Sequence, residues 1–287
     1  MISIFKKEFR SYMNNVTGSV FIAFLLLFAG LYTTAINLRG GYTSFEYVLS
    51  NITIVFLLLA PLLGMRSFAE EKRSKTDQLL YSLPMSVTQI VLGKYFAMLA
   101  VFAIPVLIMG LFPVILSLFG VVFYKAAYIA LLGFFVLGAA LIAICMFMST
   151  LTESQVISAV ISFGALLLMY MMSGLFTIVP ASPVASYVCF FVLSLAVGVV
   201  FWLLTRDFIV SAISAVVCLI PLNIFYFTNN AAFGGLFGKV ISYLAVFDRF
   251  ADMTGGIFDV TAIVYLLSFA IFFVYLTVQA VEKRRWS

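Results

Sequence analysis

Three observations predict that this chain is an all-α polytopic membrane protein. Its 287 residues are 65% hydrophobic and only 9% charged, whereas a soluble domain carries about 25% charged residues. Apolar runs of about twenty residues, enough to cross ~30 Å of hydrocarbon, recur along the chain. Lys and Arg gather in alternate connecting segments, as they do when loops face the two sides of a membrane.

The first sixteen residues, MISIFKKEFRSYMNNV, predict an interfacial helix over residues 1–16. Apolar side chains recur at helical spacing and basic ones occupy the other side, so the helix is expected to lie along an anionic membrane surface. The residues assigned to this contact are Phe5, Lys6, Lys7, Phe9, Arg10 and Tyr12. The alternative is the n-region of a signal peptide. It is disfavoured because the following apolar run is too long and shows no convincing cleavage site.

Eight apolar runs follow, each near or above the length that spans a bilayer. They cover residues 18–36, 47–65, 95–119, 127–149, 155–177, 184–204, 208–227 and 260–281. Pro105 and Pro113 lie inside the third run and predict kinks or a bent helix. The sixth and seventh runs could form a re-entrant pair, which would leave six true spans. Two runs of about twenty residues each fit a full hairpin better.

The distribution of basic residues predicts the orientation. With eight spans and the amino terminus inside, twelve of the 16 Lys and Arg residues fall in inner segments and four in outer ones. This bias predicts a multi-pass protein of the cytoplasmic membrane with both termini cytoplasmic. Residues 229–259, which include an amphipathic stretch, are then expected to face outside and to lie on or dip into the outer leaflet. No linker divides the chain, so residues 1–287 are expected to form one transmembrane domain.

One inner segment, residues 66–94, is long, polar and patterned. It carries eight of the chain's 27 charged residues. Thr76 can cap a short helix, DQLLYSL, whose leucines share one side. Ser86, with Gln89 three residues later, forms a capping box that begins the next helix. A loop with its own amphipathic helix between two spans suits docking to a soluble partner. The alternative is a cytoplasmic hairpin that only orders the two spans.

The sequence disfavours several chemical functions. No charged side chain falls near the middle of a span and the chain has no His, which argues against ion-driven carriers and intramembrane metalloproteases. Serines inside the spans have no base to activate them. Cys145, Cys189 and Cys218 lack pairing or metal-ligand spacing. The chain is therefore expected not to be an enzyme, and to carry no catalytic residue, metal site or cofactor of its own.

A nucleotide site is also missing from the sequence. The nearest approach to a phosphate loop is GGLFGKV at residues 234–240, where the glycine spacing is wrong and Val240 replaces Ser or Thr. If ATP drives this protein, a separate subunit must bind it and must contact an inner loop. The only substantial inner loop is the 66–94 segment.

Three stretches resemble the permease subunit of an ABC transporter of the type-2 exporter class, closest to the gliding-motility and copper-enzyme-maturation group. The opening, FKKEFRSYMNNVTGSVF, resembles a connecting helix that runs into the first span. The loop RSFAEEKRSKTDQLLYSLPMSVTQIVLGKYFA has the family's Arg, acidic pair, Thr-acidic-x-Leu-Leu helix and Leu-Pro turn. The end, GGIFDVTAIVYLLSFAIFFVYLTVQAVEKRRW, resembles its final span and basic-aromatic end.

This resemblance implies a six-span core with an added hairpin, and a cytoplasmic coupling helix between spans two and three that sits in a cleft of the ATPase. The residues that it assigns to ATPase coupling are Glu70, Glu71, Arg73, Thr76, Asp77, Gln78, Leu79, Leu80, Leu83 and Pro84. Lys75 departs from the family pattern, which usually has Gly before the Thr.

The resemblance also implies the assembly. Two copies of an ABC ATPase subunit would bind ATP and Mg, and a second permease chain, identical or related, would complete a dimer in membrane lipid. No nucleic-acid partner is expected, because the positive charge reports orientation. The second and fifth spans offer the candidate path-lining residues Asn51, Thr53, Ser158 and Ser162.

The path lacks charged rings that would select ions, which suits an amphipathic or hydrophobic cargo such as a peptide, drug or lipid. The function expected is therefore an ATP-driven exporter. Two alternatives come from other classes: a non-conducting membrane anchor or sensor that recruits an ATPase, and a membrane-embedded lipid enzyme.

Overall fold

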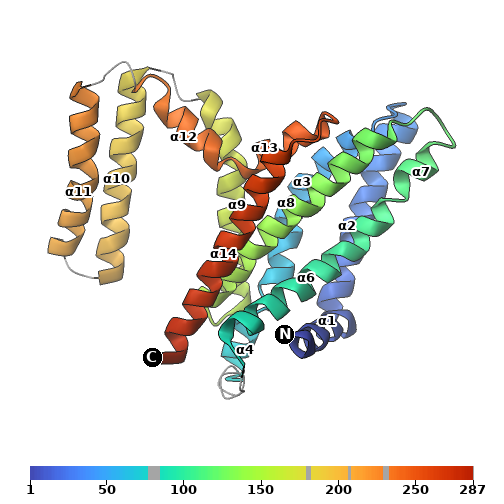
Figure 1. Cartoon of the computed structure of the whole chain (residues 1–287), viewed down its shortest axis with the longest axis horizontal. Coiled ribbons are helices and arrows are strands. Elements are labelled where there is room, and N and C mark those ends of the chain that lie inside the picture. Colours follow the sequence, from blue (N-terminus) through green and yellow to red (C-terminus); the bar gives the residue numbers. More distant parts are fainter. Residues whose placement is uncertain (77–84, 179–181, 206–207, 229–232, 287) are drawn as a thin grey trace. The chain divides into compact units, whose positions relative to one another are not determined.

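The computed structural model describes residues 1–76, 85–178, 182–205, 208–228 and 233–286, and its regular elements in these ranges are all helices (Figure 1). Six of the described helices are long and apolar enough to cross a membrane. The all-α polytopic fold is confirmed. Contacts group the chain into two compact units: unit 1 contains Met1–Leu168 and Val246–Ser287, and unit 2 contains Met169–Ala245.

The helices of unit 1 follow the predicted runs closely. They are α1 Ile2–Asn14, α2 Val16–Tyr32, the π-helix η1 Thr33–Arg39, α3 Glu46–Gly64, α4 Ala69–Arg73, α6 Val87–Met109, α7 Phe112–Leu116, α8 Tyr124–Leu151, α13 Val246–Thr254, α14 Val260–Trp286 and the first part of α9 Gln155–Ile178. Only one of the two prolines of the third run marks a break. Pro105 lies within continuous α6, whereas Pro113 is in the first turn of α7, where a residue without an N–H loses no helical hydrogen bond.

Five phenylalanines from five helices form the aromatic core of unit 1. The rings belong to Phe21 on α2, Phe56 on α3, Phe102 on α6, Phe134 on α8 and Phe250 on α13, and each is at most 2% exposed. The Phe56 and Phe102 ring centroids are 4.9 Å apart, and those of Phe134 and Phe250 are 6.1 Å apart. Tilted and edge-on pairs of this kind add to the stabilisation from burial. The core thus joins the spans around α8, the most buried of the six spanning helices.

Small residues let α3 and α8 approach closely at one point. A Cβ added to Gly64 would lie 2.8 Å from the backbone carbonyl carbon of Cys145. Glycine at such positions allows two membrane helices to pack backbone to backbone. This contact fixes the end of α3 from which the 66–94 loop departs.

The amphipathic stretch in residues 229–259 divides into two helices, α12 (Leu236–Leu244) in unit 2 and α13 in unit 1. On α13, Phe250 and Met253 are buried against α8, and Met253 fills the space beside Gly133. The position of α13 relative to the outer leaflet stays a prediction. Its apolar side is covered by the protein, because Gly133 leaves room for a side chain on α8.

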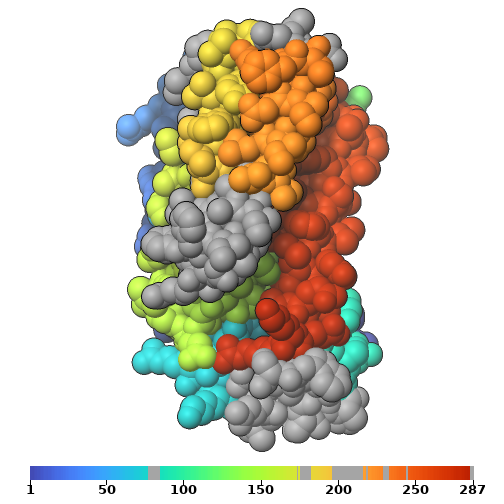
Figure 2. All heavy atoms as spheres, turned by 90° about the vertical axis from the view of Figure 1, so that its left-hand side faces the viewer, coloured from blue at the N-terminus to red at the C-terminus, as the bar shows by residue number. Residues whose placement is uncertain are grey.

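Unit 2 contains the helix pair predicted from the sixth and seventh runs. These helices, α10 (Pro183–Thr205) and α11 (Phe208–Thr228), have 23 and 21 residues and lie side by side (Figures 1 and 2). The Tyr187 hydroxyl donates to Asn223 Oδ1 at 2.8 Å, and the Tyr187 and Tyr226 rings are 4.5 Å apart. The pair is a helical hairpin by length and packing. Its complete crossing of the membrane stays a prediction.

Candidate functional site

The two described ends of the 66–94 loop are held by a cluster of polar side chains from five helices. We call this cluster the loop base. Its members are Glu8 of α1, Thr17 of α2, Arg66 between α3 and α4, Glu70, Glu71 and Lys72 of α4, Lys94 of α6, and Ser149 of α8. All of them lie in unit 1.

Lys94 is the centre of the loop base and only 2% of its side chain is exposed. Its Nζ lies 2.8 Å from Glu71 Oε1 and 3.2 Å from Glu8 Oε1, and it donates to the Ser67 carbonyl at 2.8 Å. Lys7 Nζ lies 3.8 and 3.9 Å from the same two carboxylates and supplies a second positive charge. Two carboxylates and two ammonium groups balance, so the buried charges are paired. The cluster ties α1, α4 and α6 together.

Arg66 makes a second connection, between α2 and α4. Its Nε lies 2.6 Å from Glu70 Oε2, and its Nη1 donates to Thr17 Oγ1 at 3.0 Å. The Arg66 side chain is 12% exposed and the Glu70 side chain 45% exposed, so only the arginine end of this pair is shielded from solvent.

The end of α8 supplies the cap that α4 lacks. Phe68 stands at the N-cap position of α4 and has no side chain that could cap it. Instead, Ser149 Oγ accepts hydrogen bonds from the Phe68 and Ala69 N–H groups at 3.0 Å each. Lys72 Nζ also donates to the Thr150 carbonyl. A cap borrowed from another helix satisfies the otherwise free N–H groups of α4 and fixes α4 to α8.

The chain leaves α4 through a Schellman turn. The Lys75 N–H donates to the Lys72 carbonyl at 3.2 Å, and the Thr76 N–H donates to the Glu71 carbonyl at 3.0 Å. This pattern requires a left-handed backbone conformation at the first of the two donor residues. That residue is Lys75, and its φ is 56°. The family that the chain resembles usually has Gly at this position. Here Lys75 occupies it and adopts the left-handed conformation that glycine prefers.

The predicted coupling residues divide between the loop base and the segment that follows it. Glu70 and Glu71 belong to the base, while Arg73 and Thr76 are exposed beside it. Six others lie outside the described residues: Asp77, Gln78, Leu79, Leu80, Leu83 and Pro84. Where the description resumes, Ser86 is the N-cap of α6 and its hydroxyl accepts from the Gln89 N–H at 3.3 Å, as predicted.

The predicted interfacial helix corresponds to α1. Lys6 and Arg10 are exposed, and the rings of Phe5 and Phe9 stack with their centroids 6.0 Å apart. Tyr12, expected to face the membrane, is instead 4% exposed. Its hydroxyl donates to the Leu63 carbonyl at 2.9 Å, because the last carbonyls of α3 need donors. Burial raises the pKa of Tyr12 well above its usual value, so the hydroxyl keeps the proton that it donates.

The four candidate path-lining residues do not share an opening within one chain. Ser158 and Ser162 are fully buried within this chain, and their path-lining role in the assembly stays a prediction. Thr53 is 5% exposed and donates to the Leu49 carbonyl at 3.0 Å. Asn51 alone is exposed. Within one chain, Thr53, Ser158 and Ser162 therefore pack against neighbouring residues, as small polar side chains often do between membrane helices.

An ion pair joins α14 to the start of α9. Arg284 Nη2 lies 2.8 Å from Glu153 Oε1, in the short segment between α8 and α9. The hydrogen bond from Arg284 lowers the pKa of Glu153, so the carboxylate is ionised at neutral pH. The stabilisation from this pair is present above the ordinary pKa of a glutamate and is lost as the pH falls through the lowered value.

Sequence reasoning missed the roles of three residues of the loop base. Lys94 looked like one more charge of a polar loop, Glu8 like a charge of the interfacial helix, and Ser149 like the end of an apolar run. A signal for Lys94 was available: the capping box at Ser86 places Lys94 two turns inside α6, where a charge needs a partner.

A comparison with protein families matches the chain to the family described as "ABC-2 family transporter protein" over residues 3–205. No curated protein and no solved structure matches the chain. The matched region contains the whole loop base and both ends of the 66–94 loop.

Proposed function

The chain belongs to the ABC-2 family of transporter proteins and is a permease of an ABC transporter; we propose that it serves as the membrane-spanning subunit of an ATP-driven exporter. The observation that carries this proposal is the loop base. A connection that only orders two spans needs no buried charges, whereas here paired charges and a borrowed cap hold both ends of the 66–94 loop. We infer that the loop is held firmly because force is applied to it.

In this proposal, two ATPase subunits bind ATP and Mg and contact the coupling helix predicted at residues 76–83. Their closure would press on the loop. The Lys94 cluster would pass the displacement to α1 and α6, and Ser149 would pass it to α8. Packed helices transmit such displacements as rigid bodies. A second permease chain, identical or related, would complete the path between two such units.

The loop would lie on the cytoplasmic side, with both termini, in the cytoplasmic membrane. The positive-inside bias supports this orientation. The cargo would be an amphipathic or hydrophobic molecule, such as a peptide, drug or lipid. The absence of charge near the middle of the spans supports that class. The chain itself would be non-catalytic, with ATP hydrolysed by its partner.

The proposal is tested by purifying the chain from native membranes and identifying the proteins and lipids that remain bound by mass spectrometry. The complex is then reconstituted in liposomes with candidate peptides, drugs and lipids. We expect an ABC ATPase to copurify, and cargo to stimulate ATP hydrolysis and to move only when ATP is hydrolysed. An ATPase whose hydrolysis no cargo stimulates would indicate an anchor or sensor. Cargo turnover without any ATPase would indicate a lipid enzyme.

A further inference from the structure

A buried carboxylate stands at the end of α3 opposite the loop base. Glu46 is the first residue of α3 and Gly64 the last, which places them about 27 Å apart along the helix axis. The Glu46 residue is 6% exposed, and its Oε2 has no hydrogen-bond partner in the described part of the chain. It also takes part in none of the ion pairs among the described residues. A buried carboxylate oxygen without a donor is costly.

Glu46 lines a hollow of about 420 Å³ on unit 1. Ser44 and Tyr47 beside it, Phe123 before α8 and Thr254 at the end of α13 also line the hollow. Tyr47 and Phe123 are 57% and 66% exposed, so their aromatic surfaces are accessible to a ligand. The hollow therefore combines one carboxyl group, whose Oε2 has no donor among the described residues, with two aromatic rings.

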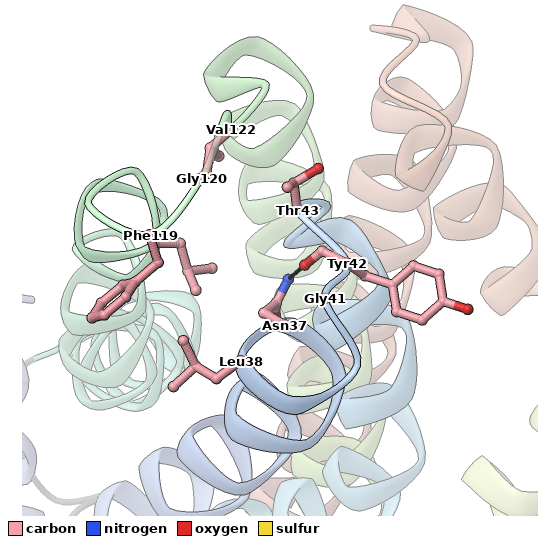
Figure 3. Close-up of a pocket in the computed structure, with 9 residues that line it drawn as sticks. Asn37, Leu38, Gly41, Tyr42, Thr43, Phe119, Gly120 and Val122 are labelled. Carbon is pink, nitrogen blue, oxygen red and sulfur yellow. Dashed lines mark hydrogen bonds between the residues drawn. The ribbon is translucent and has the colours of Figure 1, made fainter.

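The wall of the hollow is fixed before any ligand arrives. Asn37, in the π-helical end of the first span, donates from Nδ2 to the Tyr42 carbonyl at 2.6 Å and to the Ser44 carbonyl at 3.2 Å. Figure 3 shows Asn37 bonded to Tyr42 beside the neighbouring hollow. The Tyr42 and Tyr47 rings meet edge to face with centroids 6.2 Å apart. These contacts hold the segment that leads into Glu46.

We propose that this hollow binds an organic ammonium group. The ammonium would pair with the Glu46 carboxylate, and the apolar body of the ligand would lie on Tyr47 and Phe123. Charge-assisted hydrogen bonds and cation–π contacts favour this chemistry. A metal ion fits less well, because it needs several oxygen ligands and the described residues contain no group of three metal-ligating side chains. A role of this site in selecting cationic cargo rests on the proposed export function. Binding of the ammonium group itself does not require transport.

Binding is measured on the full-length chain in nanodiscs without ATPase, so that a failure of transport cannot affect the result. The probes are phenethylammonium and its neutral analogue phenethyl alcohol, titrated by ligand-observed NMR. We expect the wild-type chain to prefer the ammonium. Because a charge-assisted bond is lost, Glu46→Gln should weaken ammonium binding roughly tenfold and leave alcohol binding unchanged. Asp252→Asn is the matched control, since it removes an exposed carboxylate of α13 outside the hollow.

A second variant keeps the test decisive if Glu46→Gln fails to fold. Phe123→Ser removes an exposed ring and should weaken ammonium binding roughly two- to fivefold, as expected for one exposed cation–π contact. Equal binding of ammonium and alcohol by the wild-type chain would overturn the proposal. So would ammonium binding that survives both variants, or that falls as much in Asp252→Asn as in Glu46→Gln.

Discussion

At the scale of single residues, Lys75 is the non-glycine residue with positive φ in the described chain. The left-handed conformation costs an L-residue about 1–2 kcal/mol, and the Schellman turn after α4 requires it. Lys75→Gly should therefore keep the turn and raise the free energy of unfolding by about 1 kcal/mol. Lys6→Gly, in the exposed interior of α1, is the control and should lower it by a similar amount. Thermal unfolding in detergent measures the stability of both variants. An equal decrease in the free energy of unfolding for both substitutions would contradict the left-handed turn.

A second residue-scale prediction concerns Lys94. Replacing it with Met leaves the carboxylates of Glu8 and Glu71 buried with only Lys7 nearby. Removing one partner of a buried ion pair typically costs about 3–5 kcal/mol. Lys7→Met is the matched control, because the Lys7 side chain is 64% exposed and exposed pairs contribute about 0–1 kcal/mol. Denaturant unfolding of both variants measures the difference. If Lys94→Met lowers the free energy of unfolding no more than Lys7→Met does, Lys94 does not hold the loop base together.

At the scale of helices, one prediction concerns the close approach of α3 and α8 at Gly64. Gly64→Ala would place a methyl group against the backbone of Cys145, and overpacking of this kind costs about 1–3 kcal/mol. Gly30→Ala on α2 meets nothing within 4 Å, so the same substitution should there be neutral or stabilising by about 0.5–1 kcal/mol. Melting temperatures of the two variants in the same detergent provide the measurement. A Gly64→Ala variant as stable as Gly30→Ala would show that the helices are farther apart.

Most helix bounds could be predicted because run length and capping are local properties. The runs at 155–177 and 208–227, for example, lie within one residue of α9 and α11 at each end. The placement of α13 and Tyr12 could not be predicted. An amphipathic pattern has the same appearance whether its apolar side meets lipid or protein, and only the folded chain brings Gly133 or the Leu63 carbonyl to that side.

The candidate site was predictable only in part, for a related reason. The polar pattern of the 66–94 loop marked the segment, and Glu70 and Glu71 were identified within it. The partners that fix the loop come from distant parts of the chain: Glu8 is 86 residues from Lys94, and Ser149 is 81 from Phe68. No local pattern encodes such pairings. The path-lining role of Ser158 and Ser162 stays a prediction, because a polar side chain in a span can face another helix as well as a path, and both are buried within this chain.

At the scale of the whole molecule, the first prediction concerns orientation. In a background without the three native cysteines, single cysteines at Ser74 and Thr205 should resist an impermeant thiol reagent added outside intact cells. Cysteines at Lys125 and Thr254 should react. This pattern follows from eight spans with both termini inside. External labelling at Thr205 would instead support a re-entrant pair and six spans.

The central claim is that the 66–94 loop docks the ATPase, and Leu80 tests it most directly. The sequence places Leu79, Leu80 and Leu83 on one side of a helix among charged residues, and an apolar patch there implies a partner surface. Interface anchors typically cost about 2 kcal/mol or more when lost, and a buried unpaired charge costs more. Leu80→Glu should therefore leave the chain inserted in the membrane but strip or uncouple its ATPase.

The measurement is the amount of ATPase that the chain retains in detergent extracts, together with ATP hydrolysis and transport by the same preparations. Lys125→Glu, an exposed change in the first turn of α8 and on the outer side in the proposed topology, is the control and should keep the partner. The account predicts that Leu80→Glu loses most of the bound ATPase or its coupling while Lys125→Glu loses neither. Retention of both the ATPase and transport by Leu80→Glu at the control's level would contradict it.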